Sequence, residues 1–317
     1  MARHDRIKRG AEYAAARALL AVFGWIPRRM ALAAGEAVAW VGFHAARRQR
    51  QVGLENLRMA MPELSEAERL SILRGSFSNL GRLLAEFSHF PELTPSNVSD
   101  RVVYDGLENY LEGVRRGRGV LYLAAHFGAW ELMSFAHAIA GHPMKFVVRA
   151  IDNPMVDRLI QDYRGLGGNV PIVKRNASRE IIRALRENRA VGILMDQNTS
   201  RDEGIFVDFF GVSAATTPSV ATLALRTGAA VVPAFLIWDP HSGKHRLRFD
   251  PPVPTVQTGD FAHDVAENTR RFNAVVEEYV RQYPDHWLWI HRRWKTRPEG
   301  SAALYASQAA SGHAQSR

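Results

Sequence analysis

A histidine and a glutamate five positions apart, His126 and Glu131, are the residues of this sequence best suited to acid–base chemistry. An imidazole titrates near neutral pH, and it can remove a proton from a hydroxyl when a carboxylate holds its other ring nitrogen. We therefore interpret His126 as a candidate general base and Glu131 as the group that orients it. A hydrogen-bonded histidine with a purely structural role fits the same spacing, so the pair alone does not establish a reaction.

Other kinds of catalytic centre lack a sequence signal. Zinc needs three or four ligands, but there is no H-E-x-x-H motif, no second histidine at helical spacing from His126 and no cysteine. The lack of cysteine also excludes disulfides and thiol nucleophiles. No G-x-S-x-G, G-K-[ST] or dinucleotide-binding glycine motif is present in a suitable setting. We therefore expect no metal and no bound cofactor.

The elements that must position this pair follow from the pattern around it. His126 stands where the apolar run 119–125 gives way to a helix-like pattern at 130–140. Similar β-rich runs occur at 145–149, 190–195, 205–210, 230–237 and 245–249, and helical patterns at 154–165, 178–188, 217–227 and 261–282. Such alternation predicts an α/β fold with a mixed, mostly parallel sheet flanked by helices. In such sheets sites collect beyond the carboxyl ends of strands, where His126 lies.

The first part of the chain is predicted to be helical. Residues 52–90 indicate helices with a boundary near Pro62, after which Ser65 is a candidate N-cap. Two uncharged stretches, 18–27 and 37–46, are each shorter than the about 20 residues of a spanning helix. Arginines flank both, which favours a helical region lying in a membrane interface. A helical hairpin packed on the domain is the alternative.

Composition limits the organisation and the partners. A chain of 317 residues with 46% hydrophobic content can bury a substantial core, in one large domain or two smaller ones. The net charge of +9 favours anionic partners, and basic residues are densest near the N-terminus. We divide the chain into a membrane-interface region (1–50), an α/β domain (51–300) and a disordered tail (301–317). Nucleic-acid motifs and aromatic stacking platforms are lacking, so we expect no nucleic-acid partner.

Four separated segments resemble the bacterial lipid A late acyltransferases. The segment Ala125–Glu131, AHFGAWE, is similar to the H-x4-[D/E] motif of glycerolipid and lipid A acyltransferases, and glutamate is the usual choice in the lipid A branch. The other segments resemble the lipid A enzymes specifically: 148–154, then 195–198 with 204–211, and 287–300. Their order and spacing match across residues 1 to about 300.

This resemblance implies a glycerolipid-acyltransferase-like fold, with residues 51–300 as the acyltransferase domain. It implies transfer of a fatty acyl chain from acyl carrier protein to a hydroxyl of a lipid A precursor. The enzyme would be monotopic or N-terminally anchored at the cytoplasmic face of the inner membrane, against an anionic membrane surface. His126 would deprotonate the hydroxyl while Glu131 fixes its tautomer. The acyl thioester is already activated, so the reaction needs no metal or ATP.

The resemblance also implies substrate-binding residues, which are Arg149, Asp196, Asp208, Phe209, Gly211, Arg292 and Arg293. Arg149 would contact phosphate or an oxyanion, although a strand-end salt bridge fits the same residue. Asp196 could instead orient a neighbour or cap a turn. We expect the tryptophans at 287, 289 and 294 to pack on the core, and Arg292 and Arg293 among them to contact substrate phosphates.

Two other functions fit parts of this pattern. The same histidine and glutamate could acylate a different lipid, such as a lysophospholipid or another glycolipid. The chain could also be a basic protein without catalytic activity that binds nucleic acid or membranes through its arginines. The first alternative differs in the acceptor, and the second predicts that replacing His126 leaves acyl transfer unchanged.

Overall fold

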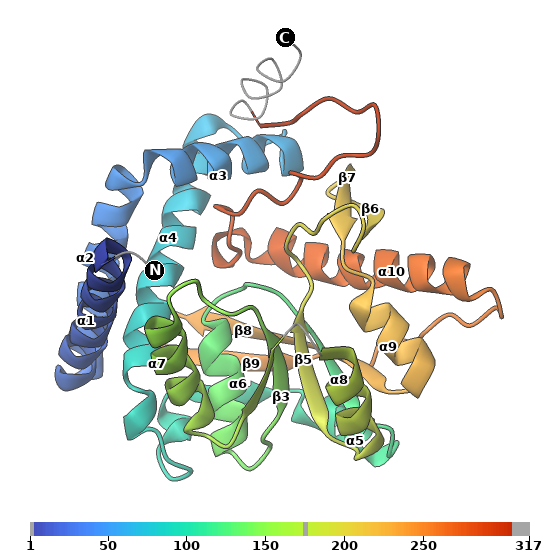
Figure 1. The fold of residues 1–317 in the computed structure, drawn as a ribbon, viewed down its shortest axis with the longest axis horizontal. Coiled ribbons are helices and arrows are strands. Elements are labelled where there is room, and N and C mark those ends of the chain that lie inside the picture. The colour runs from blue at the N-terminus through green and yellow to red at the C-terminus, as the bar shows by residue number, and fades with distance from the viewer. Residues whose placement is uncertain (1–2, 174–176, 306–317) are drawn as a thin grey trace.

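The computed structural model describes residues 3–173 and 177–305, which form a central sheet with helices on both faces (Figure 1). The sheet of these described residues has seven strands in the order β1-β9-β8-β2-β5-β3-β4. Neighbouring strands are parallel except β8 and β9. The strands are β1 (Val102–Asp105), β2 (Val120–Ala124), β3 (Lys145–Val148), β4 (Val170–Val173), β5 (Ala190–Leu194), β8 (Ala230–Asp239) and β9 (Lys244–Phe249). The predicted mixed, mostly parallel α/β architecture is confirmed.

The remaining elements surround this sheet. An antiparallel hairpin of β6 (Ile205–Phe209) and β7 (Val212–Thr216) stands apart from it. The helices of the α/β region are α5 (Leu107–Arg115), α6 (Trp130–Ile139), α7 (Pro154–Gly165), α8 (Ala177–Arg186), α9 (Ser219–Thr227) and α10 (Phe261–Gln282). Short 3-10 turns are η1 (Phe90–Glu92), η2 (Val98–Asp100) and η4 (Pro284–His286). Every strand and helix that the sequence predicted in this region occurs, whereas β1, β4, β7 and α5 were not predicted.

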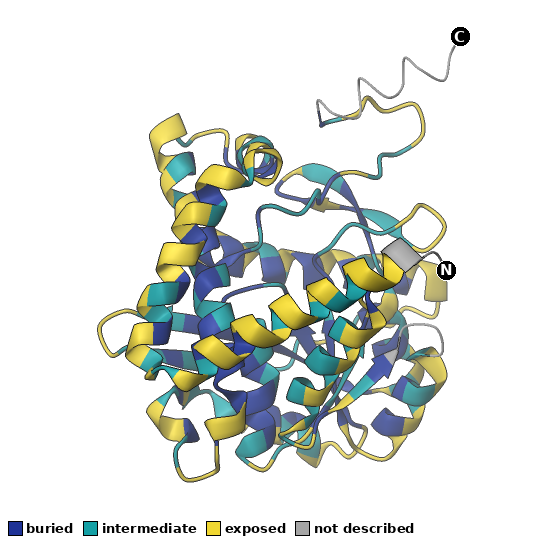
Figure 2. Ribbon diagram, turned by 60° about the vertical axis from the view of Figure 1, so that its left-hand side comes forward, coloured by how far each residue is buried: buried dark blue, intermediate teal, exposed yellow. Residues whose placement is uncertain are grey.

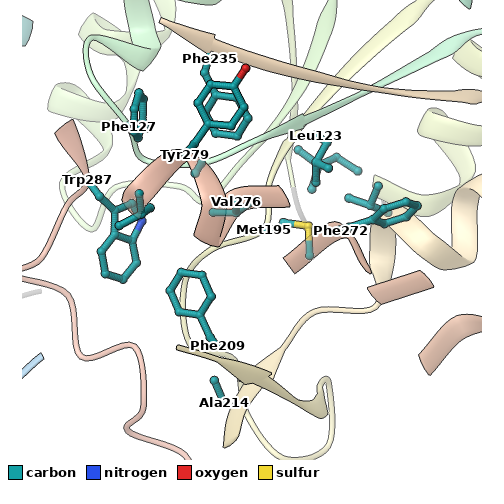
Figure 3. Close-up of a cluster of buried hydrophobic side chains, with 14 of the residues drawn as sticks. Leu123, Phe127, Met195, Phe209, Ala214, Phe235, Phe272, Val276, Tyr279 and Trp287 are labelled. Atoms are coloured by element: carbon teal, nitrogen blue, oxygen red, sulfur yellow. The ribbon is translucent and has the colours of Figure 1, made fainter. Parts of the chain in front are cut away.

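The central strand β2 is buried on both of its faces. All five of its residues are buried, as expected for an inner strand covered by helices on both sides. Leu121 and Leu123 join the core cluster beneath α10, while Tyr122 joins the cluster beneath α6. Figure 3 shows the first cluster, in which the ring of Tyr279 from α10 stacks on Phe235 of β8 at a centroid distance of 3.8 Å. This packing fixes the sheet edge from which the functional residues project.

Four helices precede the sheet: α1 (Arg3–Trp25), α2 (Arg28–Ala45), α3 (Arg47–Ala60) and α4 (Glu66–Ser88). The predicted boundary near Pro62 lies between α3 and α4, and the predicted cap Ser65 forms a capping box with Glu68 at the start of α4. Helix α2 packs on α4 through two glycines, since a Cβ placed on Gly35 would lie 2.4 Å from the carbonyl oxygen of Gly81. The close approach of the two backbones therefore requires glycine at that crossing.

A buried carboxylate ties this helical region to the sheet. Glu86 of α4 is fully buried and accepts hydrogen bonds from Arg28 at the start of α2 and from the His245 imidazole of β9. Arg101 lies 3.6 Å from the same carboxylate. Burial alone would raise the pKa of Glu86, but the hydrogen bonds from His245 and Arg28 lower it to about 2. The first turn of α2 is thus held to the α/β region by a charged cluster.

Much of the surface of α1 and α2 is exposed (Figure 2), and it includes large apolar side chains. Their exposed large side chains are Ile7, Leu19, Val22, Trp25, Met30, Val38, Trp40 and Val41. Within residues 3–173 and 177–305, no helix has both the length and the apolar character required to cross a bilayer. Membrane association of this region stays a prediction.

The fold extends into the segment for which we expected disorder. Tyr305 is buried, and its hydroxyl accepts a hydrogen bond from the Trp294 backbone and donates one to the Asn56 side chain. Of the predicted tail, residues 301–305 are therefore part of the structure, and residues 306–317 lie outside the described residues.

Candidate active site

The register of two central strands brings His126 next to Asp196. Strands β2 and β5 are parallel neighbours in which Ala124 pairs with Leu194. Two residues farther along each strand, the chain reaches His126 and Asp196 at the same edge of the sheet. Strand β3 is the next neighbour, and Arg149 follows directly after its last residue. The carboxyl ends of three adjacent parallel strands therefore supply the ionisable groups, as expected for a sheet of this type.

The carboxylate of Asp196 holds His126 at two points. Its Oδ1 accepts from the imidazole Nδ1 at 2.9 Å, and its Oδ2 accepts from the backbone N–H of His126 at 3.0 Å. The indole of Trp287 donates to the same Oδ2 at 2.7 Å. Burial raises the pKa of Asp196, but the neighbouring imidazole and these hydrogen bonds outweigh it, so the pKa lies below its usual value. Asp196 is therefore an ionised, rigidly held partner for the imidazole.

The hydrogen bonds define which ring nitrogen of His126 can accept a proton. With Nδ1–H donated to Asp196, Nε2 carries the free lone pair and accepts from the side-chain amide of Gln197 at 3.1 Å. The imidazole side chain is 20% exposed, whereas the carboxylate beneath it is 2% exposed. An oriented imidazole with an accessible Nε2 has the geometry of a general base.

The expected contact between Glu131 and the imidazole is replaced by a different ion pair. Glu131 lies in the first turn of α6, and its carboxylate accepts two hydrogen bonds from the guanidinium of Arg164 on α7, at 2.8 and 2.5 Å. Asp196 takes the orienting position instead, so the assignment of Glu131 as the group that holds His126 is corrected. Glu131 and His126 nevertheless line the same cavity.

The turn between His126 and α6 depends on a glycine. Gly128 has a φ of 57°, and a Cβ at this position would lie 2.1 Å from the carbonyl oxygen of Leu236. Only glycine fits this close approach in a left-handed conformation. Ala129, the N-cap residue of α6, makes no side-chain capping hydrogen bond, and Trp130 and Glu131 of the first turn line the cavity.

The cavity beside His126 is mostly apolar. Its volume is about 220 Å³, and it lies between the sheet edge and α6. Its apolar wall consists of Ala124, Met133, Met144, Phe146, Val147, Val148 and Leu194, together with Gly192. Trp130 adds an indole, and the polar lining residues are His126, Glu131, Ser134, Arg149 and Arg164. The site thus combines a general base with a compartment suited to a hydrocarbon chain.

A second cavity, of about 400 Å³, adjoins the first because Arg149 lines both. Arg292 also lines this second cavity. The structure therefore places two of the predicted substrate-binding residues at cavities: Arg149 lines the cavity beside His126 and also the second one, which Arg292 lines as well.

The other predicted substrate-binding residues do not line either cavity. Asp208, Phe209 and Gly211 belong to the β6–β7 hairpin, where Asp208 is exposed and Gly211 forms the turn with a φ of 69°. The ring of Phe209 is fully buried against Trp287 and Trp294. These three residues thus belong to the hairpin and line neither described cavity, while Phe209 packs against Trp287, the residue that donates to Asp196.

Arg293 also differs from its expected role. Its side chain is 0% exposed and donates to the Ala215 carbonyl, the Thr216 hydroxyl and the Asn273 side chain. A guanidinium enclosed in this way cannot reach a substrate phosphate. The three tryptophans of the segment, Trp287, Trp289 and Trp294, are buried, which confirms that they pack on the core.

Three residues of the site were not predicted: Arg164, Gln197 and Trp287. Arg164 and Trp287 come from distant parts of the chain, and no local pattern connects them with His126. A usable signal existed for Asp196, because His126 and Asp196 each directly follow a predicted strand, 119–125 and 190–195. Residues that follow neighbouring parallel strands meet at one sheet edge, which would have paired them.

No group of three or more histidine, aspartate or glutamate side chains in the described ranges has an arrangement suited to a metal ion. That the reaction requires no cofactor stays a prediction.

Comparisons with known proteins agree with this geometry. A family model described as bacterial lipid A biosynthesis acyltransferase matches residues 4–296. Among Escherichia coli (strain K12) proteins, the chain is 30% identical over 261 residues to a lipid A biosynthesis lauroyltransferase, covering 82% of this chain and 83% of that protein. A palmitoleoyltransferase (28% over 260 residues, 82% and 83%) and a myristoyltransferase (29% over 256 residues, 81% and 78%) of lipid A biosynthesis are similar to it. The chain belongs to the bacterial lipid A biosynthesis acyltransferase family and is an acyltransferase.

Proposed function

We propose that this enzyme transfers a fatty acyl chain from acyl carrier protein to a hydroxyl of a lipid A precursor, using His126 as the general base. The observation that carries this proposal is the pairing of His126 with Asp196 at the mouth of an apolar cavity. The names of the relatives, all lipid A biosynthesis acyltransferases, support the acceptor class. The choice of a thioester donor rests on a chemical argument. An acyl thioester is already activated, so a general base suffices to transfer its acyl group to a hydroxyl.

In the proposed mechanism, the acceptor hydroxyl replaces the Gln197 amide at Nε2 of His126. His126 removes the hydroxyl proton as the oxygen attacks the thioester carbonyl, and the C–O bond forms in a tetrahedral intermediate. The C–S bond then breaks, and the imidazolium returns its proton to the departing thiolate. Asp196 keeps Nδ1 protonated and stabilises the imidazolium between these steps.

The oxyanion of the tetrahedral intermediate requires hydrogen-bond donors. The start of α6, where Trp130 and Glu131 line the cavity, presents backbone N–H groups at the positive end of the helix dipole. Arg149 adds a guanidinium from the opposite wall. Loss of one such donor typically costs about 10²–10³ in turnover.

The acyl chain would occupy the apolar part of the cavity. Met133 and Met144 line it together with Phe146, so its wall combines flexible and rigid side chains. The ion pair between Glu131 and Arg164 closes one side of this space and joins α6 to α7. In this proposal the Glu131–Arg164 pair shapes the cavity. Each side chain neutralises the charge of the other at the cavity wall.

We further propose that α1 and α2 attach the enzyme to the cytoplasmic face of the inner membrane. The side chains of Trp25 and Trp40 are 91% and 66% exposed, and amphipathic aromatic rings favour the membrane interface. Exposed basic residues of the same helices, among them Arg6, Arg17 and Arg29, would meet anionic headgroups. A lipid acceptor would thereby stay in its bilayer during the reaction.

The proposed function is tested by incubating the full chain with acyl carrier proteins bearing different acyl chains and a lipid A precursor, followed by mass spectrometry. The expected product is heavier by one acyl chain, and His126→Ala should form at least about 100-fold less of it. A lysophospholipid offered as the acceptor tests the alternative. Equal product from wild type and His126→Ala, or transfer to the lysophospholipid alone, would overturn the proposal.

A further inference from the structure

The second cavity is lined by residues from four segments that are distant in the sequence. Helix α3 contributes Arg48, the loop after β3 contributes Arg149, and the C-terminal segment contributes Arg292 and Lys295. Asn198, two residues after Asp196, completes the wall nearest the base. Arg149 also lines the apolar cavity beside His126, so the two cavities share one wall residue.

The lining of this cavity is cationic. Its nine lining residues include three arginines and one lysine, and none of the nine is an aspartate or glutamate. A concave surface lined by one sign of charge attracts ligands of the opposite sign, so this cavity favours an anion. The arginine fork suits phosphate in particular, because it donates two parallel hydrogen bonds.

The start of α3 has an unfavourable charge pattern. Its first turn carries Arg47, Arg48 and Arg50, contains no acidic residue and has no side-chain cap. Cations at a helix N-terminus interact unfavourably with the helix dipole. The charge pattern of this turn is therefore unfavourable for α3, and an anion bound at Arg48, the one of the three that lines the cavity, would offset it.

The neutral part of the wall is rigid and connected to the catalytic pair. The Asn198 backbone N–H donates to Nε2 of His291 at 3.0 Å, and burial lowers the pKa of His291 to about 4, which keeps it neutral. Asn56 of α3 donates to the His291 carbonyl, and the Leu288 backbone N–H donates to the His126 carbonyl. These hydrogen bonds hold the C-terminal segment, which carries Arg292 and Lys295, in a defined position relative to His126.

We propose that this second cavity binds a phosphate group of the substrate that reacts at His126, with Arg48, Arg149, Arg292 and Lys295 as its cationic wall. This inference rests on the proposed function, which provides two sources of phosphate. One is a phosphate monoester on the sugar of the acceptor, and the other is the phosphodiester of the pantetheine arm on acyl carrier protein. Both offer the same chemistry to the arginines, so the experiment must separate them.

The test uses the double variant Arg48→Gln/Lys295→Gln, with Arg47→Gln as a matched control. Arg47 lies in the same helical turn and carries the same charge, but it is not among the lining residues. We measure kcat and KM with a phosphorylated acceptor and its phosphatase-treated form, and with acyl carrier protein and acyl-pantetheine as donors. Hydrogen bonds to charged groups contribute about 1.5–3 kcal/mol, so KM should rise tenfold or more in the double variant.

The pattern of KM identifies the source. If the acceptor phosphate occupies the cavity, KM rises for the phosphorylated acceptor and stays unchanged for the dephosphorylated one. If the donor phosphate does, KM rises for acyl carrier protein and stays unchanged for acyl-pantetheine. KM values of the double variant within twofold of the Arg47→Gln values, for both acceptor and acyl carrier protein, would overturn the inference.

A binding measurement separates this inference from the reaction itself. Isothermal titration calorimetry with glucosamine 1-phosphate requires no acyl transfer and can be carried out on the His126→Ala chain. Binding that the double variant loses supports the phosphate site even where the full chain transfers no acyl group. Equal heats for both proteins, including no heat in either, count against the site.

Discussion

His126 and Asp196 are joined by two hydrogen bonds, one to the imidazole and one to the backbone N–H of the same residue. This arrangement fixes both the ring and the peptide that carries it, so the imidazole cannot rotate without breaking contact with the carboxylate. The indole N–H of Trp287 donates a hydrogen bond to Oδ2 of the same carboxylate and thereby helps to fix its orientation. The catalytic pair therefore depends on residues that follow β2 and β5 and on the C-terminal segment.

Replacing the orienting carboxylate should reduce turnover without unfolding the protein. In Asp196→Asn the side chain keeps its shape but loses the charge that stabilises the imidazolium, and it can favour the wrong tautomer. We expect kcat to fall by about 10²–10⁴ with little change in KM. Initial rates with saturating donor, compared with thermal melts of wild type and variant, check this prediction.

The matched comparison for that variant is Glu131→Gln, in which the other carboxylate of the site loses its charge. If Glu131 orients the imidazole instead, Glu131→Gln will show the large fall in kcat and Asp196→Asn will not. A normal kcat for Asp196→Asn would therefore contradict the dyad that the structure displays.

Glu131 and Arg164 should behave as one unit in a double-mutant cycle. Each single change, Glu131→Gln or Arg164→Met, leaves one polar partner unpaired at the cavity wall, and we expect kcat/KM to fall about tenfold. In the double variant neither partner is left alone, so the loss should be close to that of the worse single variant. Arg158→Met, on the exposed side of the same helix, serves as the control. Additive losses would show that the two side chains act independently.

The arrangement of elements was largely predictable because the buried strands are continuous apolar runs. Strands β2, β5 and β8 are buried on both faces and stand out from their surroundings. Strand β1 has only four residues, of which one is buried, so its sequence lacks that signal. It is defined by pairing with β9, a contact with a residue more than one hundred positions away.

The partner of His126 was not predicted for a related reason. Glu131 is close in sequence, but the first turn of α6 directs its carboxylate toward Arg164, which only the packing of α7 on α6 brings near. Asp196 is 70 positions from His126, and the register of β2 with β5 makes them neighbours. Local sequence spacing identified His126 as the base. Its carboxylate partner could be found only from the pairing of β2 with β5, which joins distant parts of the chain.

Gly192 should influence which acyl chains the enzyme accepts, if the apolar cavity holds the chain as proposed. A Cβ at Gly192 would lie 2.6 Å from the methyl carbon of Met144, and both residues line the cavity. Gly192→Val would therefore fill space and displace Met144 into the cavity. Each methylene that no longer fits is worth about 1–3 kcal/mol, so preference should shift at least tenfold toward shorter chains. Competition between acyl carrier proteins of different chain length measures the shift.

The control for this prediction is Gly165→Ala, because a Cβ at that position meets no atom within 4 Å. An unchanged chain preference in Gly192→Val, with normal kcat, would mean that the acyl chain lies elsewhere.

Glu86 should make stability depend on acid. Its pKa is about 2 in the folded state, below the 4.5 of an unperturbed glutamate, so its contribution is complete above pH 4.5 and is lost as the pH falls through about 2. Glu86→Gln leaves Arg28 and Arg101 without their buried counter-charge and should cost about 3–5 kcal/mol at pH 7. Urea unfolding of both proteins between pH 7 and pH 2 should show the difference shrinking toward low pH.

Glu66→Gln is the control for that experiment. Hydrogen bonds from Arg58 and Arg69 lower the pKa of Glu66 to about 2 as well, but its side chain is exposed, where solvent screens such pairs. Glu66→Gln should therefore change stability much less than Glu86→Gln. Equal losses in the two variants would show that burial does not determine the contribution of Glu86.

The exposed face of α1 and α2 should bind anionic bilayers through its tryptophans. Trp25→Ser/Trp40→Ser removes two large exposed rings without disturbing the packing of α2 on α4, where Gly35 and Gly81 meet. Burying one large apolar side chain is worth about 1.5–3 kcal/mol, so partitioning into phosphatidylglycerol-containing vesicles should fall at least tenfold. Leu111→Ser, on α5 away from these helices (Figure 1), removes an exposed apolar side chain elsewhere and should leave partitioning unchanged.

Cosedimentation at low and high salt separates the apolar contribution of the tryptophans from the electrostatic contribution of the arginines, because salt screens only the attraction between arginines and headgroups. Partitioning that is equal in wild type and the double variant would place the membrane contact on another surface.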